Sequence, residues 1–188
     1  MLDPDDTVVL YEELAFQDVM PVRWDCQPPE PAAAVGLAER NLLVMQAWDA
    51  LEDHAVLEKG DENAPLAAEI QRLDRKMTLL LALVGQLLAL NRPRPAPVPL
   101  RFNARGALWR PLEAAPQAGA QGILEIYLHE CIAQPLRLGG RITAVAATGE
   151  VKVRFDPLDD ALCAVITKIT FRRHRRQIAG RHAPSRVS

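Results

Sequence analysis

The strongest pattern along the chain is a run of apolar residues at heptad spacing between residues 66 and 90. When Ile70 is placed at heptad position a, every a and d position from 66 to 87 is apolar. These positions form a predicted heptad seam that consists of Leu66, Ile70, Leu73, Met77, Leu80, Val84 and Leu87. A repeat of about 3.5 residues is typical of helices that pack along one another as coiled coils. The pattern therefore predicts a long helix, which ends where prolines become frequent at 91–99.

Two other interpretations of this helix are a membrane span and a surface helix of a monomer. Its uninterrupted apolar stretch is shorter than the ~18–20 residues that cross a bilayer, so no membrane span is expected. A surface helix needs a single apolar stripe, whereas leucines here also occupy e and g positions at 81, 83, 88 and 90. A monomer would expose a leucine-rich patch that soluble proteins rarely tolerate. We therefore expect a homo-oligomeric helical bundle, with a tetramer favoured over a dimer.

Residues on both sides of this helix show other periodicities. Residues 7–24 are rich in valine and aromatic residues and predict one or two strands. Residues 32–58 have apolar residues at helical spacing, and residues 158–180 predict a helix whose first half is apolar and whose second half is basic. Short alternating runs separated by turn residues indicate a small antiparallel barrel or sandwich, and they lie at 98–110, 121–131, 134–148 and 149–157.

These elements predict an α+β fold in which a helical hairpin interrupts the strands of a barrel. Residues 1–30 are expected to supply the N-terminal strand or strands, and residues 31–91 the inserted hairpin with its heptad repeats. The remainder of the barrel and the C-terminal helix are assigned to residues 92–180, and residues 181–188 are expected to be a disordered tail.

Charge is distributed unevenly over a chain whose net charge is only −2. Residues 1–30 are acidic, with Arg23 as their single base, whereas residues 161–188 contain lysine and arginine but no acid. This asymmetry predicts that the two ends meet each other or that the basic end contacts an anionic partner. The candidate contacts are Arg172, Arg173, Arg175 and Arg176. A solvated helix end that complements the helix dipole explains the same residues without a partner.

Composition and short motifs exclude several classes of function. Three cysteines without close pairing and an acidic N-terminus without a signal pattern predict a cytoplasmic protein. The stretch "LHEC" at 128–131 is expected on a strand and lacks the further ligands of a zinc site, and "RLGGR" at 137–141 is interpreted as a hairpin turn. No metal or catalytic residue is expected. Nucleic-acid binding is disfavoured by the isoelectric point near 6.1.

Five segments occur in the order found in one bacterial family. "DVMPVRW" precedes the predicted hairpin, and "FNARGALWR", "AQGILEIYL", "LRLGGRITAVAATGEVKVRFDPL" and "AVITKITFRRHRRQ" follow it. Together they resemble the PilZ domain, the module best known as a receptor for cyclic di-GMP. The resemblance implies a six-stranded antiparallel barrel with a C-terminal helix, and it places the coiled-coil hairpin between the first and second strands.

The residues that bind the dinucleotide in this family are replaced in this chain. The family has an RxxxR segment before the first strand, where this chain has acidic residues such as Glu12 and Glu13. In the (D/N)xSxxG turn, Arg101 takes the place of the acid and Asn103 that of the serine, and only Gly106 matches. The departures predict weak or no direct binding of cyclic di-GMP. The alternative is a direct receptor that uses non-standard arginines from the C-terminal helix or from positions 92 and 94.

The resemblance thus implies a non-enzymatic, oligomeric signalling or adaptor protein in bacterial cyclic di-GMP-linked regulation. Its expected partners are further copies of itself and an unidentified regulatory protein, and no other cofactor is expected. Motility, pilus function, biofilm formation and virulence are outputs typical of the family, and no residue of this chain selects among them.

Overall fold

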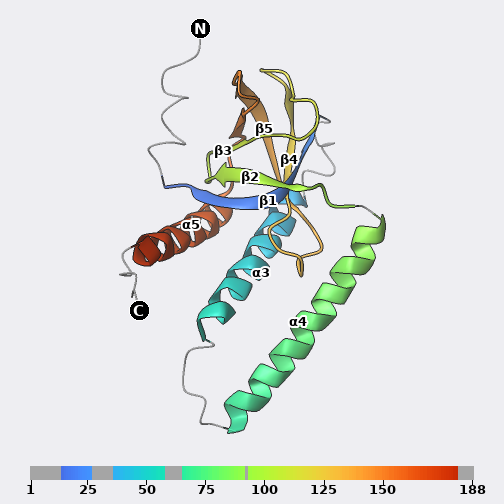
Figure 1. Cartoon of the computed structure of the whole chain (residues 1–188), viewed down its shortest axis with the longest axis vertical. Coiled ribbons are helices and arrows are strands. Elements are labelled where there is room, and N and C mark those ends of the chain that lie inside the picture. Colours follow the sequence, from blue (N-terminus) through green and yellow to red (C-terminus); the bar gives the residue numbers. More distant parts are fainter. Residues whose placement is uncertain (1–13, 27–35, 58–64, 92, 182–188) are drawn as a thin grey trace, which may run out of the picture.

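The computed structural model describes residues 14–26, 36–57, 65–91 and 93–181. Within these ranges, six strands close into a barrel in the order β1-β2-β3-β6-β5-β4, and every neighbouring pair is antiparallel (Figure 1). The strands are β1 (Phe16–Asp25), β2 (Pro97–Phe102), β3 (Gly106–Trp109), β4 (Gln121–Ile126), β5 (Leu136–Val145) and β6 (Val151–Phe155). The helices are α3 (Leu37–Leu57), α4 (Pro65–Asn91) and α5 (Asp160–Arg181).

The expected fold class, an α+β protein with a six-stranded antiparallel barrel, is confirmed. Both α3 and α4 lie between β1 and β2 in the chain, where the hairpin was expected. The described part of residues 7–24 forms the single strand β1, and residues 1–13 lie outside the described residues. Arg181, expected in the tail, is the last residue of α5, and residues 182–188 also lie outside the description.

The core consists of the inward side chains of the barrel and of one face of α3. Phe16 of β1 lies opposite Phe102 of β2, and the two rings are 5.2 Å apart. Trp48 of α3 packs edge-on against Phe16 at 5.1 Å, and Met45 is completely buried beside it. Burial of each such side chain stabilises the fold by about 2–3 kcal/mol. As a result, α3 and α5 are fixed side by side beneath the barrel (Figure 1).

The "RLGGR" stretch is not a hairpin turn, so that prediction is wrong. Gly139 and Gly140 lie within β5, and a Cβ atom on Gly140 would lie only 2.4 Å from the carbonyl oxygen of Arg154. Glycine is required here because two strands approach closely. The turn of this hairpin follows β5, where Gly149 has a φ of 83° and donates its N–H to the carbonyl oxygen of Ala146.

The "LHEC" stretch is not on a strand, because β4 ends at Ile126. It forms a turn in which the backbone N–H of Cys131 donates to Nδ1 of His129 at 3.1 Å. Arg94 holds this turn in place: its guanidinium donates to the carbonyl oxygens of His129, Glu130 and Ile132 at 2.9–3.3 Å. Arg94 is therefore engaged in the fold, which removes it from the non-standard arginines considered for a ligand.

Candidate functional site

The seam predicted from the heptads faces solvent along α4. Six of its seven residues are described at side-chain level, and each exposes between 49% and 64% of its surface: Ile70, Leu73, Met77, Leu80, Val84 and Leu87. The side chain of Leu66 lies outside the described residues. Leu79, Leu81 and Leu83 are exposed to a similar degree, so the apolar face extends beyond the a and d positions. One isolated chain thus leaves a long leucine-rich face of α4 uncovered.

The helix α4 meets the rest of the molecule near the turn at 130–131. A Cβ atom on Gly85 would lie 2.8 Å from the carbonyl oxygen of Glu130, so glycine permits this close approach. The thiol of Cys131 points toward the carbonyl oxygen of Thr78 at 3.9 Å. Burial, with the charge of Glu130 next, raises the pKa of the Cys131 thiol, which therefore stays protonated near neutral pH.

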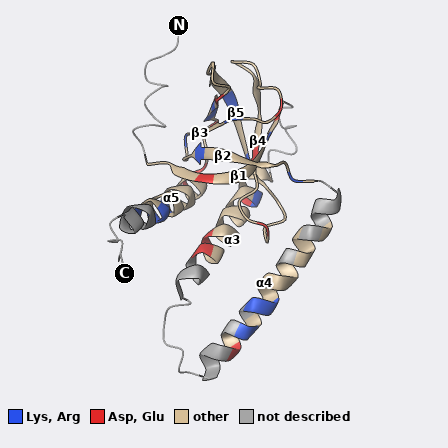
Figure 2. Ribbon diagram, viewed as in Figure 1, with Lys and Arg blue, Asp and Glu red and all other residues tan. Residues whose placement is uncertain are grey.

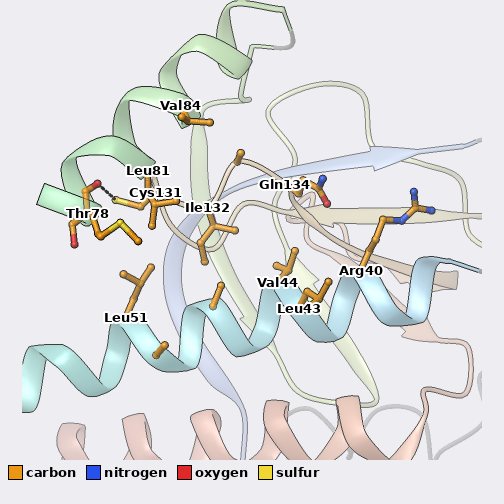
Figure 3. A pocket seen from close by; sticks show the side chains of 14 residues that line it. Arg40, Leu43, Val44, Leu51, Thr78, Leu81, Val84, Cys131, Ile132 and Gln134 are labelled. Carbon is orange, nitrogen blue, oxygen red and sulfur yellow. Dashed lines mark hydrogen bonds between the residues drawn. The ribbon is translucent and has the colours of Figure 1, made fainter. Parts of the chain in front are cut away.

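An apolar groove of about 550 Å³ lies between α3, α4 and the turn at 131–134 (Figure 3). The walls from α3 and α4 are almost entirely aliphatic, with Leu43 and Leu51 facing Leu81 and Val84. Arg40 and Gln134 are the charged and polar side chains at one end. The arrangement can take up an apolar side chain row, and it offers few hydrogen-bonding groups to a polar ligand.

The basic helix α5 does meet acidic residues of the chain, and Arg173 is the main contact. Its guanidinium donates to Asp18 of β1 at 2.6 Å and to Glu52 of α3, and it lies 4.6 Å from the ring of Phe16 and 5.3 Å from that of Trp48. Burial would lower the pKa of Arg173, but the hydrogen bond and charge of Glu52, followed by those of Asp18, raise it overall. One side chain thereby connects three elements.

A second ion cluster joins α5 to α3. Asp49 accepts hydrogen bonds from Lys168 and Arg172, each at 2.7 Å. Burial alone would raise the pKa of Asp49, but the hydrogen bond from Lys168 and the charge of Arg172 outweigh burial and lower it. Of the four arginines expected to contact an anionic partner, Arg172 and Arg173 are thus engaged within the chain. Arg175 is exposed, and the side chain of Arg176 lies outside the described residues.

The β2–β3 turn is held by the residues expected to be a degenerate ligand site. Oδ1 of buried Asn103 accepts hydrogen bonds from the backbone N–H groups of Arg105 at 2.8 Å and of Gly106 at 3.1 Å. A Cβ atom on Gly106 would lie 2.3 Å from the carbonyl oxygen of Val153, so glycine is needed for the close approach to β6. Arg101 lies on the outer face of β2, opposite Gln17 and Leu108. Two of the three residues therefore have a structural role in the turn.

Strand register brings together two arginines that the sequence pattern did not indicate. Arg141 of β5 lies directly opposite Arg154 of β6, and both are exposed. Exposed Arg105 follows in the adjacent turn, and its carbonyl oxygen accepts the N–H of Phe155. The residues are widely spaced in sequence, so only the pairing of β5 with β6 reveals their proximity.

A model of the atypical PilZ domain, described as a cyclic di-GMP receptor, matches residues 45–183. The chain belongs to this family. Among solved structures, it is similar to a pathogenic protein from Xanthomonas campestris that is described as a new tetrameric PilZ domain self-assembled via an unusual helical bundle. The two share 25% identity with a TM-score of 0.69, over 95% of this chain and 98% of the other. A comparison with curated proteins finds no match.

The PilZ assignment confirms the resemblance drawn from the sequence, and it places the chain in a family described as receptors rather than enzymes. The helices α3, α4 and α5, as far as they are described, are too short or too polar to cross a membrane. Over the same ranges, no three His, Cys, Asp or Glu side chains are grouped so that they could hold a metal ion. The features left to explain function are the exposed face of α4, the groove and the arginines of the barrel.

Proposed function

We propose that this PilZ protein is a non-enzymatic cytoplasmic signalling protein that assembles through α4 into a tetramer and acts by contact with a regulatory protein. The observation that carries the proposal is the exposure of the whole described seam, from Ile70 to Leu87. An apolar face of this length rarely stays in contact with water in a soluble protein. The tetrameric helical bundle described for the Xanthomonas relative supports the same use of the helix.

The groove beside α4 favours the same occupant, a helix from a second copy. Met77, Leu81 and Val84 of α4 line the groove, whereas Leu80 and Leu87 are exposed without lining it. A sister α4 that places its leucines in the groove would cover α4 and the exposed Leu43 of α3 together. The buried face of α3 is already used by the barrel, so α3 contributes to a bundle only through this outer edge.

Assembly is tested by substituting charges into the seam. Leu80→Asp with Leu87→Asp should prevent assembly, because each buried and unpaired carboxylate costs several kcal/mol, on the order of 3 or more. Light scattering coupled to gel filtration should give four times the chain mass of 20.8 kDa for the wild type and a lower mass or poor solubility for the variant. Arg75→Asp, on the polar side of α4, is the matched control and should stay tetrameric. A wild-type mass of 20.8 kDa would contradict the proposal.

Cyclic di-GMP binding by the family's usual clamp should be weak or missing in this chain. No arginine or lysine precedes Arg23 in the sequence, so the cations that normally hold the dinucleotide before the first strand are lacking. Output through motility, pilus function, biofilm formation or virulence remains part of the proposal on family grounds only. The adaptor role predicts that a regulatory protein binds the assembled form, which a pull-down with the wild type and with the Leu80→Asp, Leu87→Asp variant would test.

A second candidate function is direct reception of the dinucleotide by non-standard arginines. The specific observation in its favour is the exposed pair of Arg141 and Arg154 beside the β2–β3 turn. Arg172 and Arg94, which the sequence offered for this role, are engaged by Asp49 and by backbone carbonyls. Titration calorimetry with cyclic di-GMP distinguishes the candidates, since tight binding would make reception the principal role.

A further inference from the structure

The outer face of β5 and β6 brings two like charges into direct opposition. Arg141 and Arg154 are paired in register, and directly opposite residues of antiparallel strands have Cβ atoms about 5 Å apart. On the other side of Arg154 the paired residue is Gly106, which adds no side chain. Arg105 extends the cluster, because the hydrogen bond from Phe155 to its carbonyl oxygen fixes the turn at 2.8 Å against β6. We call Arg105, Arg141 and Arg154 the barrel arginine cluster.

This arrangement is unfavourable in the absence of an anion. Like charges directly opposite one another destabilise a sheet. Among the described residues, Asp156 contributes one carboxylate at the edge of this face, where its Oδ2 lies 2.7 Å from the position of a Cβ on Gly139. Three arginines against this carboxylate leave the face positively charged. By contrast, Arg173 and Arg172 have carboxylate partners inside the fold.

We infer that the barrel arginine cluster is a binding site for the phosphodiester of a cyclic dinucleotide. Planar guanidinium groups donate paired hydrogen bonds to phosphate oxygens, and an anion between Arg141 and Arg154 would relieve their repulsion. The inference rests on the second candidate function and names its residues. Because the site offers charge but few groups that read a base, binding should be weak and should depend strongly on salt.

The extent of the cluster favours a small ligand over a nucleic-acid strand. On the same outer surface, the β1–β2 pair presents Val19 opposite Pro99 and Pro21 opposite Pro97, without charge. Val19 exposes 61% of its surface there, so the neighbouring face is apolar and open to water. A duplex makes phosphate contacts along an extended basic stripe. The described surface offers a short patch instead.

The inference is tested by titration calorimetry of the full chain with cyclic di-GMP at low and at physiological salt. The wild type should bind at low salt and more weakly at physiological salt, and Arg141→Ala with Arg154→Ala should lose at least ten-fold in affinity. Arg110→Ala, which removes an exposed arginine at the other end of β3, is the matched control and should bind as the wild type does. No binding by the wild type, or equal binding by the double variant, would overturn the inference.

A second measurement separates a ligand site from a structural role. Arg141→Gln removes the repulsion, so the unliganded variant should melt at the same temperature as the wild type or higher, and the rise in Tm that cyclic di-GMP causes should disappear. A lower Tm combined with unchanged dinucleotide affinity would assign Arg141 to the fold and overturn the inference. Retention of duplex DNA that depends on Arg141 and Arg154, without dinucleotide binding, would also overturn it.

Loss of this inference is distinguishable from loss of the assembly proposal. Light scattering reports assembly alone, and the barrel arginine variants should keep the wild-type mass, because the arginines lie on β5, β6 and the β2–β3 turn and not on α4. A monomeric wild type that still binds cyclic di-GMP through Arg141 and Arg154 would contradict assembly and support the site.

Discussion

Arg173 shows how a single residue can connect several elements of this PilZ protein. Its side chain, only 25% exposed, bonds to Asp18 of β1 and Glu52 of α3 and packs over Phe16 and Trp48. A planar guanidinium satisfies two carboxylates and an aromatic face at once, which an ammonium group does not. The residue that looked like a partner contact in the sequence therefore fixes α5 against β1 and α3.

Replacement of Arg173 should lower stability according to how much of this geometry is lost. Arg173→Met leaves Asp18 and Glu52 without their cation and should decrease the free energy of unfolding by about 3 kcal/mol. Arg173→Lys keeps the charge but loses the fork, and should lose less. Urea denaturation at one protein concentration measures both. Exposed Arg175→Met is the control and should stay within about 0.5 kcal/mol of the wild type. Equal stability of Arg173→Met and the wild type would exclude the clamp.

Residues were predictable from the sequence where their role is local. The heptad positions from Ile70 to Leu87 were identified because they follow one another on a single helix, and Asp159 was expected at the start of α5, where Oδ1 accepts the N–H of Leu162 at 2.8 Å. Gly139 and Gly140 were misinterpreted because a glycine pair suits both a turn and a close strand approach. The opposition of Arg141 and Arg154 depends on register, which no local pattern encodes.

At the level of elements, α3 and α5 are held together by the ion cluster around Asp49. The side chain of Asp49 is 18% exposed and accepts hydrogen bonds from Lys168 and Arg172. The net effect of burial, hydrogen bonding and charge is a pKa below the ordinary 3.8. A carboxyl with a lowered pKa in the folded state stabilises the fold above its unfolded pKa, and this stabilisation is lost as pH falls through the folded value.

The contact between α3 and α5 should therefore weaken in acid. At pH 7 the wild type should be more stable than Asp49→Asn, because the charged carboxylate is present only in the wild type. As the pH falls from about 5 to 2, the difference in Tm between the two proteins should shrink, and thermal denaturation across this range measures it. Asp160→Asn, an exposed acid at the start of α5, is the control for general acid effects. A difference that stays constant down to pH 2 would contradict the lowered pKa.

At the level of the whole molecule, the barrel and α4 have different requirements for stability. The barrel has a closed sheet and a continuous core that includes Trp48 and Phe16, so its strands and α3 are stabilised within one chain. The helix α4 shares little of that core and exposes its seam. The predicted fold class could be obtained from one sequence because strand alternation and family order agree. The relation of α4 to the barrel could not, since it is set by the packing of Gly85 on the turn at Glu130.

Assembly through α4 predicts that stability depends on protein concentration. Unfolding of a tetramer releases four chains, so dilution favours the unfolded state by mass action and lowers Tm. Differential scanning fluorimetry over a hundredfold range of concentration should show a falling Tm on dilution for the wild type. The Leu80→Asp, Leu87→Asp variant, if it remains soluble, has no assembly to lose, and its Tm should not change over the same range. A Tm that is independent of concentration in both proteins would show that α4 is stabilised within a single chain, and the seam would then need an explanation other than self-association.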